Sequence, residues 1–136
     1  MSTFENSNRN LDTLIDATAS LLYYTGIAFA NGGLTGTPDH GKAVDCYMQA
    51  SALGNIDSLY CLGLCYANGW GVPIIDHETA CSFYTEAAEN GHPAATYTLG
   101  LCYENAWGVP YDVDKAYEFF HKAADLGYPE AIEKLI

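Results

Sequence analysis

Basic side chains are scarce in this 136-residue sequence, which carries five lysines and arginines against 17 aspartates and glutamates. The resulting net charge of -12 argues against nucleic acid and anionic membrane surfaces as partners, because too few cations exist to neutralise phosphates. It permits a basic partner, although solubility alone would also account for it. No apolar run approaches the roughly 18 residues that a membrane span needs, so membrane insertion is not expected.

The sequence also lacks the marks of secretion. No basic and then apolar leader opens it, no Asn-x-Ser/Thr acceptor occurs, and its five cysteines cannot all be paired with one another. Free thiols in a reducing, cytoplasmic compartment are the simplest account, while export by a specialised secretion system stays open. The polar residues 1–10 are expected to be disordered.

What the sequence does contain is a repeat. The stretch LGLCYANGWGVP at residues 62–73 returns as LGLCYENAWGVP at residues 99–110, an offset of 37 residues. A fainter copy, TGIAFANG, lies at residues 25–32. A fixed period of this size is typical of stacked supersecondary units, so the chain is predicted to be a solenoid whose function lies on a surface.

Each unit predicts a pair of helices. Small or apolar residues four apart, such as Ala95, Leu99 and Tyr103, mark the buried stripe of a first helix. Each second helix is expected to begin within about two residues of an N-capping aspartate. These aspartates are Asp39, Asp76 and Asp112.

The pattern divides the chain into one repeat domain over residues 11–136. Its units lie at about 19–55, 56–92 and 93–128, followed by a capping helix at 129–136. A long helix from about residue 11 to residue 30 opens the domain, and its first turns are expected to cover the open end of the solenoid.

Glycines recur at two positions of the unit. Gly26, Gly63 and Gly100 lie inside first helices, where each costs about 1 kcal/mol against alanine, so a close approach of a second helix is predicted there. A glycine also ends the first helices of units one and two. Ala106 takes that place in unit three, so its turn must differ or carry strain.

The third unit carries the fullest motif, Ala-x3-Leu-Gly-x2-Tyr from Ala95, then Trp-Gly-Val from Trp107, then Asp-x2-Lys-Ala from Asp112. This pattern resembles the Sel-1-like repeat family of tetratricopeptide-related helix pairs, over Ala19 to Tyr128. The resemblance implies an all-α, right-handed α-solenoid. It also implies scaffold or adaptor work on a protein or peptide partner, with no catalytic residue and no cofactor.

Three classes of function follow. A non-enzymatic binding module is the leading hypothesis, and the chain is expected to act as a monomer. The alternative is a hydrolase of cell-wall or β-lactam substrates, as proposed for some cysteine-rich relatives, but no Ser-x-x-Lys or Gly-x-Ser-x-Gly motif occurs. The segment His77-Glu78-x-x-Cys81 only approaches the His-Glu-x-x-His zinc pattern. A structural piece that assembles with its own copies is the third option.

The predicted binding residues form two rows on the face of the first helices away from the buried stripe. These are Tyr23, Tyr60 and Tyr97 in one row and Ile27, Leu64 and Leu101 in the other. Solenoids bind extended ligands along such rows on the concave helix face, but the same side chains could instead pack between neighbouring first helices. Acidic residues near the rows favour a basic or amide-rich partner, namely Asp57, Glu104, Glu130 and Glu133.

Two further candidates are Trp70 and Trp107, each in the connection between the helices of its unit. A tryptophan in such a connection is either an exposed anchor or folds back over its own loop. The cysteines, by contrast, predict packing and no metal site, because Ala28 occupies the position that Cys65 and Cys102 hold in later units.

Overall fold

The computed structural model describes residues 3–136, and no residue of this range lies in a β-strand. In chain order the elements are α1 (Thr3–Ala30), the short 3-10 helix η1 (Gly33–Thr35), α2 (His40–Ala52), α3 (Ile56–Asn68), α4 (His77–Glu89), α5 (Pro93–Asn105), α6 (Val113–Asp125) and α7 (Pro129–Lys134). The predicted all-α solenoid of helix pairs is confirmed.

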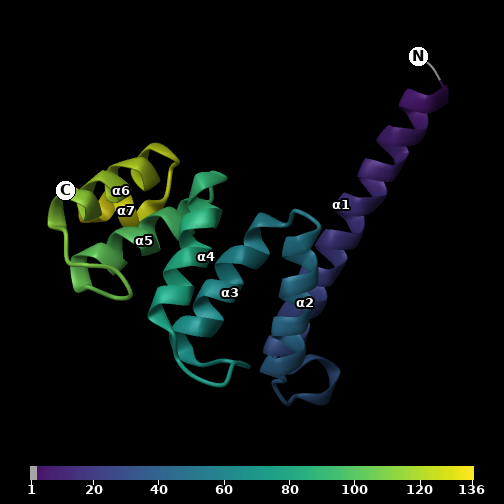
Figure 1. Ribbon diagram of the computed structural model, residues 1–136, viewed down its shortest axis with the longest axis horizontal. Coiled ribbons are helices and arrows are strands. Elements are labelled where there is room, and N and C mark those ends of the chain that lie inside the picture. Colours follow the sequence, from purple (N-terminus) through teal and green to yellow (C-terminus); the bar gives the residue numbers. More distant parts are fainter. Residues whose placement is uncertain (1–2) are drawn as a thin grey trace.

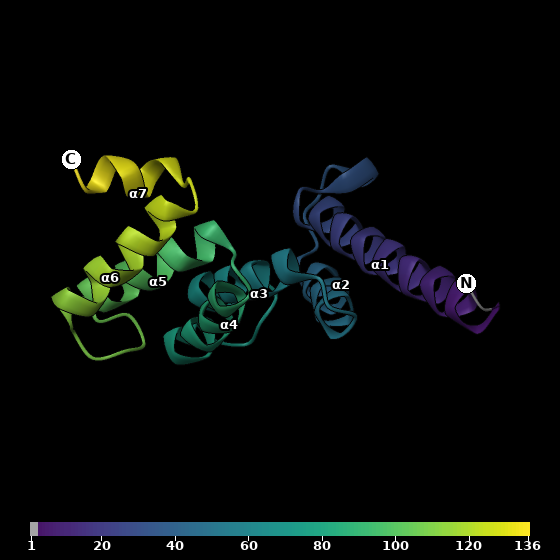
Figure 2. The same ribbon diagram turned by 90° about the horizontal axis from the view of Figure 1, so that it is seen from above.

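The helices pack as α1 with α2, α3 with α4, and α5 with α6, and each pair packs on the next through α2 with α3 and α4 with α5. Figure 1 shows the pairs following one another along the molecule, with the two termini at opposite ends. The short helix α7 packs on α6 and closes the last pair, as Figure 2 shows from above.

Each second helix begins directly after its predicted cap. Asp39, Asp76 and Asp112 accept a hydrogen bond from the backbone N–H three residues on, each at 3.0 Å. These bonds satisfy amides that an uncapped helix would leave without a partner. The backbone N–H of each aspartate also donates to an equivalent carbonyl of the first helix, that of Phe29, Tyr66 or Tyr103. Asp112 follows its carbonyl by nine residues and the other two by ten, so the third connection is one residue shorter.

The first helix departs from the prediction. It begins at Thr3, so residues expected to be disordered are helical from that point, and Met1 and Ser2 lie outside the described residues. No Gly or Pro interrupts the sequence before Gly26, so nothing stops the helix from extending towards the N-terminus. Its first half runs past the end of α2 into solvent and covers no part of the solenoid (Figure 1).

The glycines inside the first helices are required by close helix packing, as predicted. A Cβ at Gly26 would lie 2.6 Å from Cε1 of Tyr47, and one at Gly100 would lie 2.5 Å from Cε1 of Phe120. At Gly63 the equivalent clash is with the ring of Tyr84. One aromatic ring of each second helix therefore lies directly on the backbone of its first helix.

The turn after α5 carries the strain that its sequence indicated. Ala106 has φ 56°, the left-handed conformation that Gly69 adopts with φ 74° at the same position of the preceding unit. It is the one non-glycine residue of the described chain with positive φ. The turn therefore has the same conformation in both units, and in the third unit the Cβ of Ala106 makes that conformation sterically strained.

We therefore expect Ala106→Gly to stabilise the protein by roughly 0.5–1 kcal/mol, because glycine adopts this conformation without the Cβ strain. Urea denaturation measures the change. The reciprocal change Gly69→Ala should destabilise, since its Cβ would also lie 3.1 Å from Cγ1 of Ile75. Equal stability of Ala106→Gly and the parent chain would contradict a strained turn.

Candidate partner-binding surface

The repeat places the predicted tyrosines and aliphatic residues on one face of α1, α3 and α5. All six are partly buried and partly open to solvent: Tyr23, Ile27, Tyr60, Leu64, Tyr97 and Leu101. We call this face the tyrosine row surface. Part of each of these side chains is open to solvent, and the rest is buried within the solenoid.

The tyrosine rings are anchored from beneath. Each packs on the aromatic ring that its own second helix places over the glycine. The centroid distances are 6.3 Å from Tyr23 to Tyr47, 5.7 Å from Tyr60 to Tyr84 and 5.4 Å from Tyr97 to Phe120. The ring positions are thus set by the close helix packing within each unit.

The following unit supplies a second contact to two of these rings. Tyr60 stacks on His92 with a centroid distance of 4.9 Å, and its hydroxyl lies 3.4 Å from Oγ1 of Thr98. Tyr97 lies 5.3 Å from the ring of Tyr128. His92 and Tyr128 both precede a first helix, so the sequence repeat brings equivalent positions to equivalent rings.

The aliphatic row contributes to packing between units. Ile27 lies against a buried cluster that joins Tyr47 of α2 to Leu62 of α3, and Leu64 lies against one that joins α4 to α5. Ile27 and Leu64 therefore pack between neighbouring units with part of their side chains, as the alternative interpretation predicted. The remaining part of each side chain is exposed to solvent.

The hydroxyl of Tyr23 remains a hydrogen-bond donor over the whole physiological range. Burial, with smaller contributions from the nearby Cys61 and Asp57, raises its pKa to about 12. Burial likewise raises the pKa of Tyr128, with Glu130 and the neighbouring tyrosines adding to the shift. Tyr23 and Tyr128 thus offer neutral O–H groups at this surface.

His92 joins the tyrosine row surface to an acidic group. The backbone N–H of Ala95 donates to its Nδ1 at 3.1 Å, so the ring proton lies on Nε2, which donates to Oδ1 of Asp57 at 3.0 Å. Both ring nitrogens are engaged. His92 therefore caps α5 and holds Asp57 beside Tyr60, and neither nitrogen is left to act as a general base. This role of His92 was not predicted, although Pro93 directly after it marks a helix start.

The lysines lie on the surface and cover aromatic rings of the solenoid. All four lie over aromatic rings at 4.9–5.6 Å from the centroid: Lys42 over Phe29, Lys115 over Tyr103, Lys122 over Phe119 and Lys134 over Phe120. Lys134 also donates to Oε1 of Glu104 at 2.8 Å, which compensates one of the four acids predicted to attract a partner. Asp57, Glu130 and Glu133 remain exposed.

The two tryptophans lie away from the tyrosine row surface, in the loops that end α3 and α5. Their exposed fractions are 44 % for Trp70 and 46 % for Trp107. Trp70 stacks on His40 of the preceding unit at 5.8 Å, and the Trp107 carbonyl accepts a hydrogen bond from Sγ of Cys81 at 2.9 Å. Both loops thus reach back to the unit before, and neither indole is wholly free or wholly covered.

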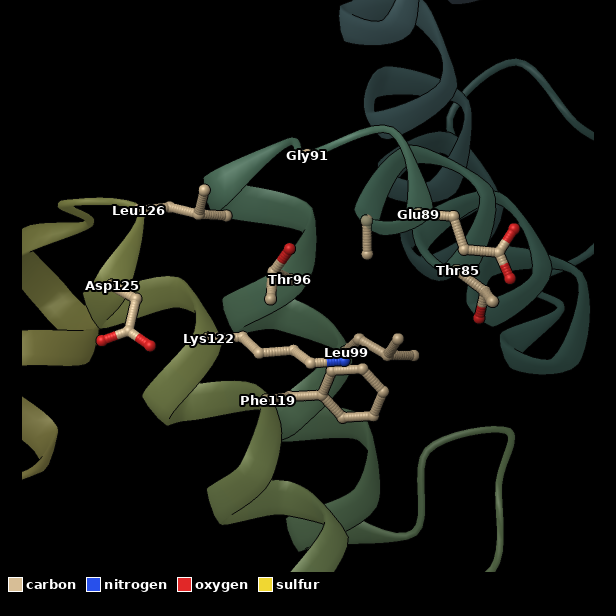
Figure 3. A pocket seen from close by; sticks show the side chains of 10 residues that line it. Thr85, Glu89, Gly91, Thr96, Leu99, Phe119, Lys122, Asp125 and Leu126 are labelled. Atoms are coloured by element: carbon tan, nitrogen blue, oxygen red, sulfur yellow. The ribbon is translucent and has the colours of Figure 1, made fainter.

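A cavity on the opposite side of α5 was not predicted. It has a volume of about 520 Å³ and lies between α4, α5 and α6, and its lining includes the side chains of Leu99, Phe119 and Lys122 (Figure 3). Two of its lining residues, Thr85 and Thr96, are smaller than the residues at the equivalent positions of the preceding units, Met48 and Leu59. Comparison of the units position by position would have shown this loss of side-chain volume.

The cysteines are packing residues. All five are unpaired, four are buried, and Cys61 is partly buried between Tyr23 and Tyr47. Burial raises the pKa of Cys61 and of Cys65 to about 11, with a smaller contribution from neighbouring negative groups at Cys61. Within residues 3–136 no three His, Cys, Asp or Glu side chains gather as metal ligands would.

These observations define the class of protein: a short α-solenoid of stacked helix pairs with an acidic surface and a row of anchored tyrosines. The model of the Sel1 repeat family matches residues 19–55, 56–92 and 93–128. The chain therefore belongs to the Sel1 repeat family. Repeats of this family are typically protein–protein interaction modules and generally non-enzymatic scaffolds.

Solved structures agree with this assignment. A Sel1 repeat protein from Oxalobacter formigenes is 29% identical with a TM-score of 0.79 over 86% of this chain and 46% of its own. The protective antigen c5321 of uropathogenic Escherichia coli, described as having an SLR fold, is 31% identical with a TM-score of 0.76 over 93% of this chain and 26% of its own. The present chain thus spans about half and about a quarter of these two proteins.

A third structure shows the same fold at lower identity. Helicobacter pylori cysteine rich protein B is 19% identical with a TM-score of 0.72, and the match covers 97% of this chain and 96% of its own. A comparison with curated proteins gave no match. None of the described helices is long and apolar enough to cross a membrane.

The double change Tyr60→Ala with Leu64→Ala tests how far the row residues serve as core. We expect the free energy of unfolding to fall by about 3 kcal/mol, because both side chains are partly buried against the junction of two units. The exposed pair Ile74→Ala with Tyr111→Ala is the control and should change stability by under about 1 kcal/mol. An equally small loss for the row pair would show that these residues are surface anchors only.

The raised thiol pKa values predict a loss of stability in alkali. Between about pH 9 and pH 11 the unfolded chain releases the protons of Cys61 and Cys65 while the folded chain keeps them, so stability falls as pH rises. Each thiol contributes up to about 1.4 kcal/mol per pH unit in that window. Urea titrations at pH 8 and pH 10.5 measure the loss, and Cys61→Ala with Cys65→Ala should reduce it. An unchanged slope in that variant would contradict the assignment.

Proposed function

We propose that this chain is a non-enzymatic adaptor that holds an extended segment of a protein partner along the tyrosine row surface on the concave helix face. The observation that carries the proposal is the row itself. Tyr23, Tyr60 and Tyr97 are anchored on a buried ring by one face and open to solvent at the other. Rigid, half-exposed tyrosines lose little conformational entropy on binding, which is why they serve well in recognition.

The chemistry of the surface indicates a basic or amide-rich segment. The tyrosine hydroxyls can donate to backbone carbonyls or side-chain amides, and Asp57 at the edge of the row can accept from cations or N–H groups. The chain carries 17 acidic against five basic residues, so the field around it is negative. An acidic field of this kind accelerates association with a cationic segment.

The tryptophans are proposed as secondary anchors. Trp70 and Trp107 expose nearly half of their surface at the loop end of successive units. A partner long enough to pass the end of the row could contact one or both. Their contribution should be separable, because neither indole packs on the tyrosine row.

The binding hypothesis is favoured over the hydrolase alternative. The pair of His92 and Asp57 is the arrangement nearest to a catalytic dyad, yet the cap bond to Ala95 occupies Nδ1. Hydrolysis of a chromogenic β-lactam by the purified chain, lost in His92→Ala, would overturn the non-enzymatic proposal. We further propose a reducing, cytoplasmic location, because all five cysteines are unpaired and four are buried as thiols.

A random peptide library displayed against the immobilised chain tests the binding proposal. We expect enrichment of Lys/Arg- and Asn/Gln-rich sequences, and the affinity of a selected peptide should fall as salt rises from 50 to about 300 mM. The triple variant Tyr23→Phe, Tyr60→Phe, Tyr97→Phe keeps the rings and should weaken binding about tenfold through loss of the hydroxyl bonds.

The control removes the hydroxyl of an exposed tyrosine that lies off the row, as Tyr111→Phe, and should leave affinity unchanged. Selection of acidic peptides, or equal weakening by both sets of variants, would argue against the tyrosine row surface as the site. Loss of binding only on Trp70→Ala with Trp107→Ala would move the site to the loops.

A further inference from the structure

Helix α1 carries an apolar stripe that no described residue covers. Leu11, Leu14 and Leu21 are exposed by 54, 63 and 68 %. With Thr18 between them they follow alternating spacings of three and four residues, which places all four on one side of the helix. This is the a and d spacing of a coiled-coil seam.

The charges of the same segment lie on the other side. At 100° per residue, Glu5, Arg9, Asp12 and Asp16 face about 160° away from the stripe. The helix is therefore amphipathic along a stretch where α2 does not reach it (Figures 1 and 2). An amphipathic helix without a core beneath it has an apolar side left for another molecule.

Comparison of the units shows what kind of contact fits. Leu21 corresponds to Ser58 in α3 and Ala95 in α5, which are both 0 % exposed. Ala95 is buried in a cluster with Ala87 of the preceding second helix, a contact that small residues allow at short helix separation. A leucine at that position does not suit such a close contact. It suits the wider separation of a leucine seam.

We propose that α1 of a second copy of this chain covers the stripe, antiparallel to the first. In this register Leu11 lies opposite Leu14 of the partner subunit, and Thr18 lies opposite Ser7 of the partner subunit. The a positions of one helix thus meet the d positions of the other, and the seam contains no charge. The stripe is complementary to itself, which is the condition for a two-fold symmetric interface.

Charge and bulk favour the antiparallel arrangement over the parallel one. The solenoid lies at the C-terminal end of α1, so a parallel pair would bring two bodies of net acidic charge side by side. An antiparallel pair places them at opposite ends of a 28-residue helix, about 42 Å long, which exceeds several Debye lengths at physiological salt. A dimer differs from the monomer expected from the sequence, because only the structure shows the stripe uncovered.

Sedimentation velocity of the full chain over a range of concentrations tests the proposal. We expect the mass to rise from one chain to two, and Leu11→Glu with Leu14→Glu to weaken the dimer at least 100-fold by placing four carboxylates in the seam. The matched control, Asn6→Glu with Thr13→Glu, adds the same charge on the polar side and should keep the dimer. Circular dichroism checks that both variants stay helical.

Cysteine cross-linking decides the orientation. A mixture of Leu11→Cys and Leu14→Cys chains, incubated with oxidised glutathione, should form the mixed disulfide faster than either chain pairs with itself. The parent chain controls for its own, mostly buried, cysteines. Faster pairing of Leu11→Cys with itself would overturn the antiparallel register. A single-chain mass at every concentration, or a dimer that survives the two glutamates, would overturn the interface.

Discussion

The solenoid depends on one contact that recurs in every unit, an aromatic ring of the second helix lying on a glycine of the first. Tyr47, Tyr84 and Phe120 occupy the space that a Cβ would need at Gly26, Gly63 and Gly100. The glycine costs about 1 kcal/mol of helix propensity, and the close approach that it allows buries a large ring in return. The same ring then supports a tyrosine of the outer row, so the packing of a unit also sets the position of its surface residue.

A second contact makes the units interdependent. A Cβ at Gly71 would clash with the backbone carbonyl of His40, and one at Gly108 with that of His77. The loop of each later unit therefore lies against the start of the second helix in the unit before. Since both glycines have positive φ, no other residue fits the conformation and the space at once. This contact explains why Trp70 stacks on a neighbouring unit instead of on its own loop.

The sequence predicts the features that repeat and misses those that do not. The period, the caps at Asp39, Asp76 and Asp112 and the glycine contacts follow from comparing the units, because each is a local rule applied three times. The length of α1 follows from the absence of any Gly or Pro before Gly26. The polar composition of residues 1–10 predicted disorder there instead, because it does not take this absence into account. The bond from His92 to Asp57 joins residues of different units, and only the stacking of helices brings them together.

The half-buried state of the tyrosine row could not be derived from the sequence either, because one face of a helix can hold a neighbour and a partner at the same time. Tyr60 contacts Tyr84 of its own unit and His92 of the next, and still keeps an exposed edge. Replacing a residue that both packs between units and is exposed at the surface changes the packing and the surface together. Changes that remove the ring alter the junction between units, whereas under the proposed function changes confined to its exposed edge alter recognition. Because the Tyr60 hydroxyl also lies 3.4 Å from Oγ1 of Thr98 in the next unit, even this polar group belongs in part to the junction between the units.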